Sequence, residues 1–289
     1  MASFVIHHVA GIEFLKRIEK EYNVYFTEEQ KNQFLLGNLI VDSIKTNLHI
    51  PKGLDEEELA FLKKEYYQKI QEEKVKTHFR MMEDEEVFIQ IPVVEKFVEK
   101  YQHIIQNDFS AMGYLFHLYT DKMFFCELFN ENFECLDKNM QPTKYTKNLR
   151  IIKVKKNGKL YSVNDVFNNE GKVSIYNDYT IMNKFLLDYY KIFFDYSGLY
   201  NYAKNNFNNP GIEEVDYNNI FNVLIETANY IKQSNESKTC NLNIFSDNSV
   251  MLFIPNIVEK FLFEYFFLFK KNIVDMKKNT NIKKIGEII

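Results

Sequence analysis

The sequence predicts an all-α fold, and three observations lead to this prediction. Glycine and proline are scarce, with 9 and 5 residues among 289, and their scarcity favours long helices with few breaks over a turn-rich all-β chain. Apolar residues make up 46% of the chain, which is enough for a substantial core. Most apolar side chains recur at helical spacing, and the candidate strands are too few for a doubly wound α/β fold.

Helices are predicted throughout the first half of the chain. Thr27, three residues before Gln30, is typical of a capped helix start, whereas Gly37 and Asn38 are expected to end or interrupt that helix. The segment 109–129 is apolar on all sides, which indicates the centre of a bundle. The other helical patterns of this half cover residues 4–20, 55–74 and 93–106.

The second half mixes helices with one or two small β-hairpins. Asn157-Gly158 separates the apolar runs 149–154 and 160–163, which predicts a hairpin with a type I′ turn. A second possible strand pair covers residues 240–245 and 250–254. Helical patterns cover residues 180–194, 217–232 and 255–271. The aromatic side chains of 261–269 are expected in the core, although such a stripe could also dip into a membrane surface.

Charge and cysteine content exclude several classes of protein. The net charge is −4, from 36 basic and 40 acidic residues, so we expect no nucleic-acid partner. The three cysteines form no CxxC motif, which is typical of a reducing compartment. The N-terminal residues lack the features of a secretory signal, and no apolar stretch is long enough to span a membrane. We therefore expect a cytoplasmic protein with no transmembrane segment.

The most informative polar residues are His117 and Asp121, within the apolar segment from Gly113 to Asp121. Four residues on a helix bring two side chains to the same face, so this pair can chelate one divalent cation. A hydrogen bond between the two side chains inside a helical core explains the same spacing. His117 and Asp121 by themselves do not separate these interpretations.

A hydrolytic metal site needs more ligands, and His7, Asp42 and His78 are the candidates. Each also has a structural explanation. Asp42 could cap the following segment, His78 could lie in a loop, and His7 could be a core histidine.

Four short motifs, taken together, resemble the bacterial zinc-dependent phospholipase C-like family. The resemblance covers roughly the first 130 residues and implies a phospholipase C-like helical bundle. Residues 1–135 are then expected to form a helical metal-binding core, and residues 136–289 to pack on it in the same compact domain. The motifs are Met1-Ala2-Ser3-Phe4-Val5-Ile6-His7 followed by Gly11, the segment from Gly37 to Ser43, Thr77-His78-Phe79, and the segment from Gly113 to Asp121.

The resemblance implies a zinc site with one or two ions. Val41 replaces a proline of the family's motif, a change that should leave the ligand Asp42 intact. No histidine follows His117, so a third zinc ion is not expected. His8 is the alternative to His7, because neighbouring side chains on a helix point about 100° apart. The implied metal ligands are His7, Asp42, His78, His117 and Asp121, with Asp42 and Asp121 as catalytic carboxylates.

The expected function is that of a zinc-dependent hydrolase acting on a phosphoester through a metal-activated water. Its substrate would be a small phosphodiester or a phospholipid-like headgroup. Arg80 could clamp a phosphate oxygen or be a solvated surface residue, and Asp178 could reach the site or cap a helix. The alternative is a catalytically inactive, metal-stabilised binding or regulatory protein of the same fold, and a third interpretation is a metal-free helical interaction protein.

Overall fold

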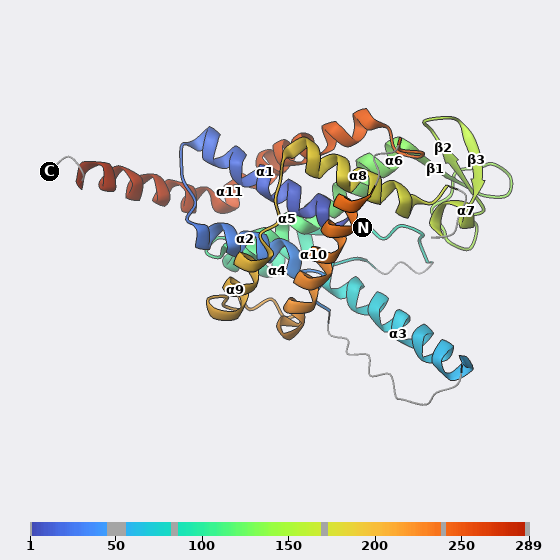
Figure 1. The fold of residues 1–289 in the computed structure, drawn as a ribbon, viewed down its shortest axis with the longest axis horizontal. Helices are drawn as coiled ribbons and strands as arrows, with labels where there is room; N and C mark the ends of the chain where they lie inside the picture. The colour runs from blue at the N-terminus through green and yellow to red at the C-terminus, as the bar shows by residue number, and fades with distance from the viewer. Residues whose placement is uncertain (1, 45–55, 82–85, 169–172, 238–240, 287–289) are drawn as a thin grey trace.

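A computed structural model describes residues 2–44, 56–81, 86–168, 173–237 and 241–286. The described part of the chain is mostly helical, with 66% helix and one small three-stranded antiparallel sheet (Figure 1). The prediction of a helical fold is therefore confirmed. The helices of the first half are α1 (Phe4–Tyr22), α2 (Glu28–Ile40), α3 (Glu56–Thr77), α4 (Val94–Ile105), α5 (Phe109–Met123), the π-helix η1 (Phe124–Phe129) and α6 (Asn130–Asn132).

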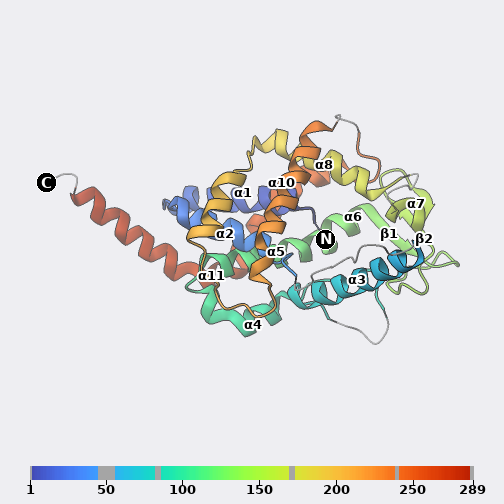
Figure 2. The same cartoon turned by 60° about the horizontal axis from the view of Figure 1, so that its bottom comes forward.

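The second half adds the sheet and the covering helices. Figures 1 and 2 place the sheet at one end of the molecule and the C-terminal part of the last helix, α11, at the other, where it extends beyond the body. The elements are β1 (Phe133–Leu136), β2 (Ile151–Val154), β3 (Lys159–Ser162), α7 (Val163–Phe167), α8 (Ile175–Tyr190), α9 (Tyr196–Asn205), the 3₁₀ helix η2 (Tyr217–Asn219), α10 (Ile220–Glu236) and α11 (Asp247–Gly286).

Side-chain caps fix the starts of the first two helices. Ser3 precedes α1 and accepts a hydrogen bond from the Ile6 amide, which satisfies one of the free N–H groups of the first turn. Thr27 and Gln30 form the capping box that the sequence predicts for α2. Both starts are therefore set by local sequence.

Helix α5 runs through the centre of the bundle, as its apolar sequence predicts. Every residue from Ser110 to Asp121 is buried. Helix α2 packs closely along α5, and two glycines make this approach possible. A Cβ atom on Gly37 would lie 2.0 Å from the Ser110 carbonyl oxygen, and one on Gly113 would lie 2.1 Å from the Phe34 carbonyl oxygen.

The prediction that Gly37 and Asn38 end or interrupt α2 is wrong. The helix continues to Ile40. Gly37 lacks a side chain because the α5 backbone occupies that space, so its role is packing and not helix termination.

The C-terminal helices α8, α10 and α11 pack on α1. One hydrophobic cluster runs through both halves of the chain, from Ala2 to Ile273. The expected strand at 250–254 is wrong, because these residues belong to α11. Pro255 lies inside that helix instead of beginning it, on an exposed face where water can hydrate the carbonyl group that its ring leaves unpaired.

The sheet is an antiparallel meander in the order β1-β2-β3. The predicted hairpin is confirmed as β2 and β3. Its turn is not type I′, because Val154 pairs with Lys159 across a four-residue loop in which only Gly158 has positive φ, at 68°. Strand β1 falls in a segment for which the sequence indicated no strand.

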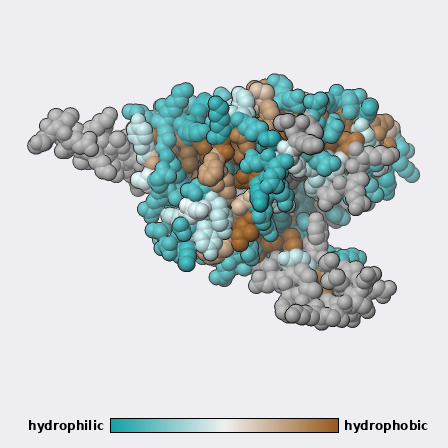
Figure 3. Space-filling view, viewed as in Figure 1, coloured by the Kyte–Doolittle hydropathy of each residue, from teal (hydrophilic) through white to brown (hydrophobic). Residues whose placement is uncertain are grey.

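Hydrophilic residues predominate on the face shown in Figure 3, with hydrophobic residues visible between them. Among the described helices, none combines the length and the apolar content that a membrane span requires. The aromatic segment of α11 is divided, since Phe261, Tyr265 and Phe269 are buried in the core while Phe263 is 91% and Phe267 is 63% exposed.

Candidate metal centre

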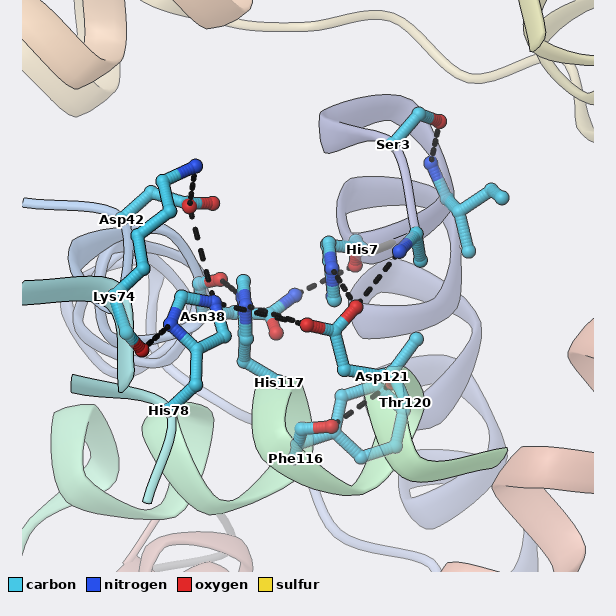
Figure 4. A network of polar contacts seen from close by, with 12 residues as sticks. Ser3, His7, Asn38, Asp42, Lys74, His78, Phe116, His117, Thr120 and Asp121 are labelled. Carbon is cyan, nitrogen blue, oxygen red and sulfur yellow. Dashed lines mark hydrogen bonds and ion pairs between the residues drawn. The ribbon is translucent and has the colours of Figure 1, made fainter. Parts of the chain in front are cut away.

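Four segments bring His7, Asp42, His78, His117 and Asp121 to one place (Figure 4). His7 lies near the start of α1, and Asp42 follows the end of α2 by two residues. His78 follows directly on the last residue of α3, and the other two lie one turn apart on α5. All five residues predicted as ligands therefore converge, although up to 114 positions separate them in the sequence (7 to 121).

The inward-facing atoms of these side chains lie at distances that suit shared ligation. Asp121 Oδ2 is 3.6 Å from His78 Nε2 and 3.9 Å from His117 Nε2, while Asp121 Oδ1 is 3.4 Å from His7 Nε2. Asp42 Oδ1 is 3.8 Å from His78 Nε2. Ligand atoms in a tetrahedron around zinc are about 3.3–3.6 Å apart, given metal–ligand bonds of roughly 2.0–2.2 Å.

Most of these inward-facing atoms have no hydrogen-bond partner within the described part of the protein. The imidazole Nε2 atoms of His7, His78 and His117, together with Asp42 Oδ1 and Asp121 Oδ2, are shielded from solvent and have no hydrogen-bond partner among the described residues. The exposed fraction is 9% for the Asp42 side chain and at most 1% for the other four. Buried polar groups without partners are costly, and these groups are so placed that they could hold a metal ion.

Backbone carbonyl groups orient two of the imidazole rings. His117 Nδ1 lies 2.8 Å from the Asn38 carbonyl oxygen, and His78 Nδ1 lies 3.1 Å from that of Lys74. Each contact places the ring proton on Nδ1 and leaves the Nε2 lone pair directed at the centre. The same arrangement fixes the tautomer of metal-binding histidines in general. The His117 ring also stacks on that of His7, with centroids 3.7 Å apart.

Asn38 links the three helices that carry the site, a role that the sequence prediction missed. Its side-chain amide donates to the His7 carbonyl oxygen at 2.6 Å, and its own carbonyl oxygen faces His117 Nδ1. Asn38 is 1% exposed. The sequence did contain a signal for this role, because Asn38 is a polar residue within the apolar run 34–41. A side-chain amide that is buried in such a run is expected to have a hydrogen-bond partner.

The pKa shifts favour ionised carboxylates at Asp42 and Asp121 and neutral imidazoles at His78 and His117. Burial tends to raise the pKa of Asp42, but Lys74 and the nearby histidines hold it well below its ordinary value. The pKa of Asp121 is also held well below the ordinary value, mainly by His7 against the opposing effect of burial. Burial lowers the pKa of His117 to about 4 and that of His78 well below its ordinary value. Neutral imidazoles and ionised carboxylates are the forms that bind metal ions.

Lys74 is a second residue beside the site that was not predicted from the sequence. It lies in the last turn of the charged helix α3, and its Nζ atom is 3.4 Å from Asp42 Oδ1. Its side chain is 20% exposed, so part of the lysine stem is buried beside the site.

His7, and not His8, faces the centre. The His8 ring is buried elsewhere, edge-on to the Phe194 ring at a centroid distance of 4.8 Å. Burial lowers the pKa of His8 to about 4. Consecutive residues on α1 therefore have separate environments, as the 100° step of a helix requires.

Several other predicted residues lie outside the centre. Asp178 neither reaches the site nor caps a helix, since Ser174 is the N-cap of α8 and Asp178 accepts hydrogen bonds from the backbone amides of 243–245. Arg80 is not a solvated surface residue, because its Nε and Nη2 atoms are shielded from solvent. His49 lies outside the described residues.

A cavity of about 1000 Å³ adjoins the centre. Asp42, Lys74 and Arg80 line it on the side of the centre. Aromatic side chains, among them Phe88 and Tyr179, also line the cavity. Asp121, His117, His78 and His7 do not line the cavity, so Asp42 is the site residue that is most accessible from it.

The centre contains two groups of side chains that could hold a metal ion. One consists of His7, His117 and Asp121, and the other of Asp42, His78 and His117. Both groups include His117, whose single free Nε2 atom can bind only one ion. Asp121 faces both groups through different oxygens, so two ions would be bridged by this carboxylate, whereas one ion would draw its ligands from both groups.

Comparisons of the chain with protein-family models, with curated proteins and with solved structures found no match.

Proposed function

We propose that this protein is a zinc-dependent hydrolase of phosphoesters. The observation that carries the proposal is the convergence of three imidazole and two carboxylate groups whose inward-facing atoms are buried and unpartnered. The resemblance of the four motifs to the zinc-dependent phospholipase C-like family supports the same function, because the converging residues are the ones that those motifs contain.

The donor set favours zinc over other common cations. Magnesium and calcium prefer oxygen ligands, whereas imidazole nitrogen with carboxylate oxygen is typical of zinc. His7, His78 and His117 would provide the nitrogens, and Asp42 and Asp121 the oxygens. When bound, zinc would supply Lewis-acid chemistry, lowering the pKa of water and stabilising charge on phosphoryl oxygens.

The two carboxylates have different roles in this proposal. Asp121 is fully buried and is held by the Ala2 backbone N–H, which donates to Oδ1 at 2.7 Å. It is therefore suited to ligation. Asp42 lines the cavity and stays ionised, so besides binding the metal it can orient a water molecule by accepting a hydrogen bond from it. Lys74 then stabilises the anionic form of Asp42 through their ion pair.

A small phosphodiester or a phospholipid-like headgroup suits the cavity. Its volume of about 1000 Å³ is at the upper end of the roughly 300–1,000 Å³ that is typical of small-molecule sites. The basic residues Lys74 and Arg80 lie beside the centre, where they favour an anionic group. The aromatic walls would contact the less polar part of the substrate.

Metal content is the first test. Purified protein should contain one or two equivalents of zinc by mass spectrometry, and His117→Ala should lose most of it, because both candidate groups include His117. His103→Ala is the matched control, since His103 is exposed and lies outside the site. Protein that takes up no zinc from a zinc-containing buffer would refute the proposal.

Turnover is the second test. The zinc-loaded chain should hydrolyse bis(4-nitrophenyl) phosphate, and Asp42→Asn should reduce kcat by about 100-fold or more, because a neutral amide is a weaker metal ligand and hydrogen-bond acceptor than a carboxylate. Asp188→Asn, at an exposed position on α8, should leave kcat unchanged. Zinc binding without turnover of phosphodiesters, phosphomonoesters or phospholipids would instead favour the catalytically inactive binding protein.

A further inference from the structure

Arg80 carries a buried guanidinium group whose hydrogen-bond donors are not used within the protein. Its Nε and Nη2 atoms are shielded from solvent, and neither has a hydrogen-bond partner among the described residues. These two nitrogens lie on the same edge of the guanidinium plane and form the fork that binds two oxygens of one anion. Buried donors of a charged group are costly when unpaired, so this fork points to an anion that comes from outside the chain.

The backbone at the end of α3 holds Arg80 beside the metal centre. The Arg80 amide donates to the Val75 carbonyl oxygen at 3.0 Å, and the Phe79 carbonyl oxygen accepts from Val93 N at 3.1 Å. Phe79 itself has a φ of 51°, a left-handed conformation that is unfavourable for a residue with a side chain. Such strain is often retained at functional sites. Here the strained turn places His78 and Arg80, two residues apart, at the same site.

The charges around Arg80 leave it available to a ligand. Lys74, the other basic residue of the cavity wall, is paired with Asp42 at 3.4 Å. Burial lowers the pKa of Arg80, and the carboxylates of Asp121 and Asp42 partly oppose this effect. The guanidinium group therefore interacts electrostatically with both carboxylates. Glu72 and Glu86 also line the cavity and are exposed. Arg80 is therefore a positively charged group with free donors at the junction of the cavity and the candidate metal centre.

We propose that Arg80 binds the phosphoryl group of the substrate, with Nε and Nη2 each donating to one non-bridging oxygen. This inference rests on the proposed phosphoester hydrolase function and assigns its anion-binding residue. It also limits the substrate class to esters whose phosphorus carries two free oxygens, as in phosphodiesters and phosphomonoesters.

Calorimetric titration of the full chain with inorganic phosphate tests this assignment. In the zinc-loaded protein, Arg80→Met should weaken phosphate binding by about 10- to 100-fold, the range expected for a lost charge-assisted pair. Arg80→Lys should give an intermediate loss, because it keeps the charge but not the fork. The matched control is Arg150→Met, since Arg150 is exposed and donates only to a backbone carbonyl oxygen.

Thermal unfolding separates ligand binding from a structural role. Because Nε and Nη2 have no partner, Arg80→Met should not lower the Tm of the zinc-loaded, phosphate-free protein, but it should abolish the increase in Tm that phosphate gives the wild type. The titration is repeated on chelator-treated protein, in which Arg80 should still contribute to phosphate binding.

Two outcomes would overturn the assignment of Arg80. The first is wild-type protein that binds no phosphate, and the second is a folded Arg80→Met variant with wild-type phosphate affinity. Neither depends on the tests of the proposed function, which are zinc content and phosphodiester turnover. A zinc-loaded, active enzyme with an unimportant Arg80 would therefore refute only this inference.

Discussion

At the scale of single residues, the site depends on atoms whose partners come from distant segments. The Asn38 amide and carbonyl groups tie α1 to α2 and α2 to α5. His117 presents a free Nε2 atom because its Nδ1 atom is held by that carbonyl group. The histidines that the sequence identified are thus oriented by polar groups that it did not identify.

The first residue-scale prediction compares the adjacent histidines of α1. His7→Ala should weaken zinc binding by at least about 100-fold, beyond the 10- to 100-fold that outer residues contribute. His8→Ala should retain zinc, because His8 packs on Phe194 and not at the centre. Competition with a chromogenic chelator measures both affinities. Loss of zinc in His8→Ala with retention in His7→Ala would show that the orientation of α1 is wrong.

A second prediction concerns Asp178, whose buried carboxylate accepts from the amides of Asn243, Ile244 and Phe245 at 2.7–3.1 Å. Asp178→Ala should lower the free energy of unfolding by about 3–5 kcal/mol, because buried N–H groups lose their acceptor. Denaturant titration measures this loss.

The matched control for that experiment is Asp188→Ala on the same helix. The Asp188 side chain is 55% exposed and pairs with Lys184, so its loss should change the stability by less than about 1 kcal/mol. Equal effects of the two substitutions would mean that the Asp178 carboxylate does not anchor residues 243–245.

At the scale of elements, the close packing of α2 against α5 positions most of the site. Gly37 and Gly113 let the two backbones approach, and this approach brings Asn38 to His117. Both glycines belong to the motifs that resemble the phospholipase C-like family. Their physical role in this structure is to provide space at a helix crossing.

Gly113→Ala should therefore destabilise the protein, although the same substitution in a free helix is favourable by about 1 kcal/mol. The added Cβ atom would lie 2.1 Å from the Phe34 carbonyl oxygen, so the helices must separate, and we expect a loss of roughly 3 kcal/mol or more. Zinc affinity should fall as well. Denaturant unfolding and zinc competition measure the two effects.

Gly198→Ala serves as the control at the element scale. Its added Cβ atom would meet the Asp195 carboxylate, which is the end of a side chain and can move. The change in stability should be within about 1 kcal/mol. A tolerated Gly113→Ala variant would contradict the close approach of α2 and α5.

At the scale of the whole molecule, the proposed metal site predicts that the stability of the fold depends on a bound ion. Removal of zinc by a chelator should lower Tm by on the order of 10 °C, since an ion bound far above its Kd contributes several kcal/mol to the stability of the folded state. Differential scanning calorimetry measures the change. The Tm of the His117→Ala variant should change little when the chelator is added. A wild-type Tm that the chelator leaves unchanged would argue against an occupied metal site.

The sequence predicted the helices of the first half better than the architecture of the second. Helices α1, α2 and α5 begin with side-chain caps, and the helices of this half follow an apolar period, so their positions depend on short-range information. The run 250–254 has high strand propensity, yet Phe253 and Ile254 are buried as part of α11. Tertiary packing of a long helix overrode local propensity there.

By itself, the sequence determined the helical class of this protein and the five residues that meet at the candidate metal centre. The helical class follows from residue type and spacing, which act over a few turns of a helix. The five residues were predicted from the resemblance of four short motifs to a known family. Only the tertiary structure decided that His7 faces the centre in place of His8, that Asn38 and Lys74 support it, and that Arg80 is buried beside it. Burial and electrostatic field arise from segments far apart in the chain, so no local pattern encodes them.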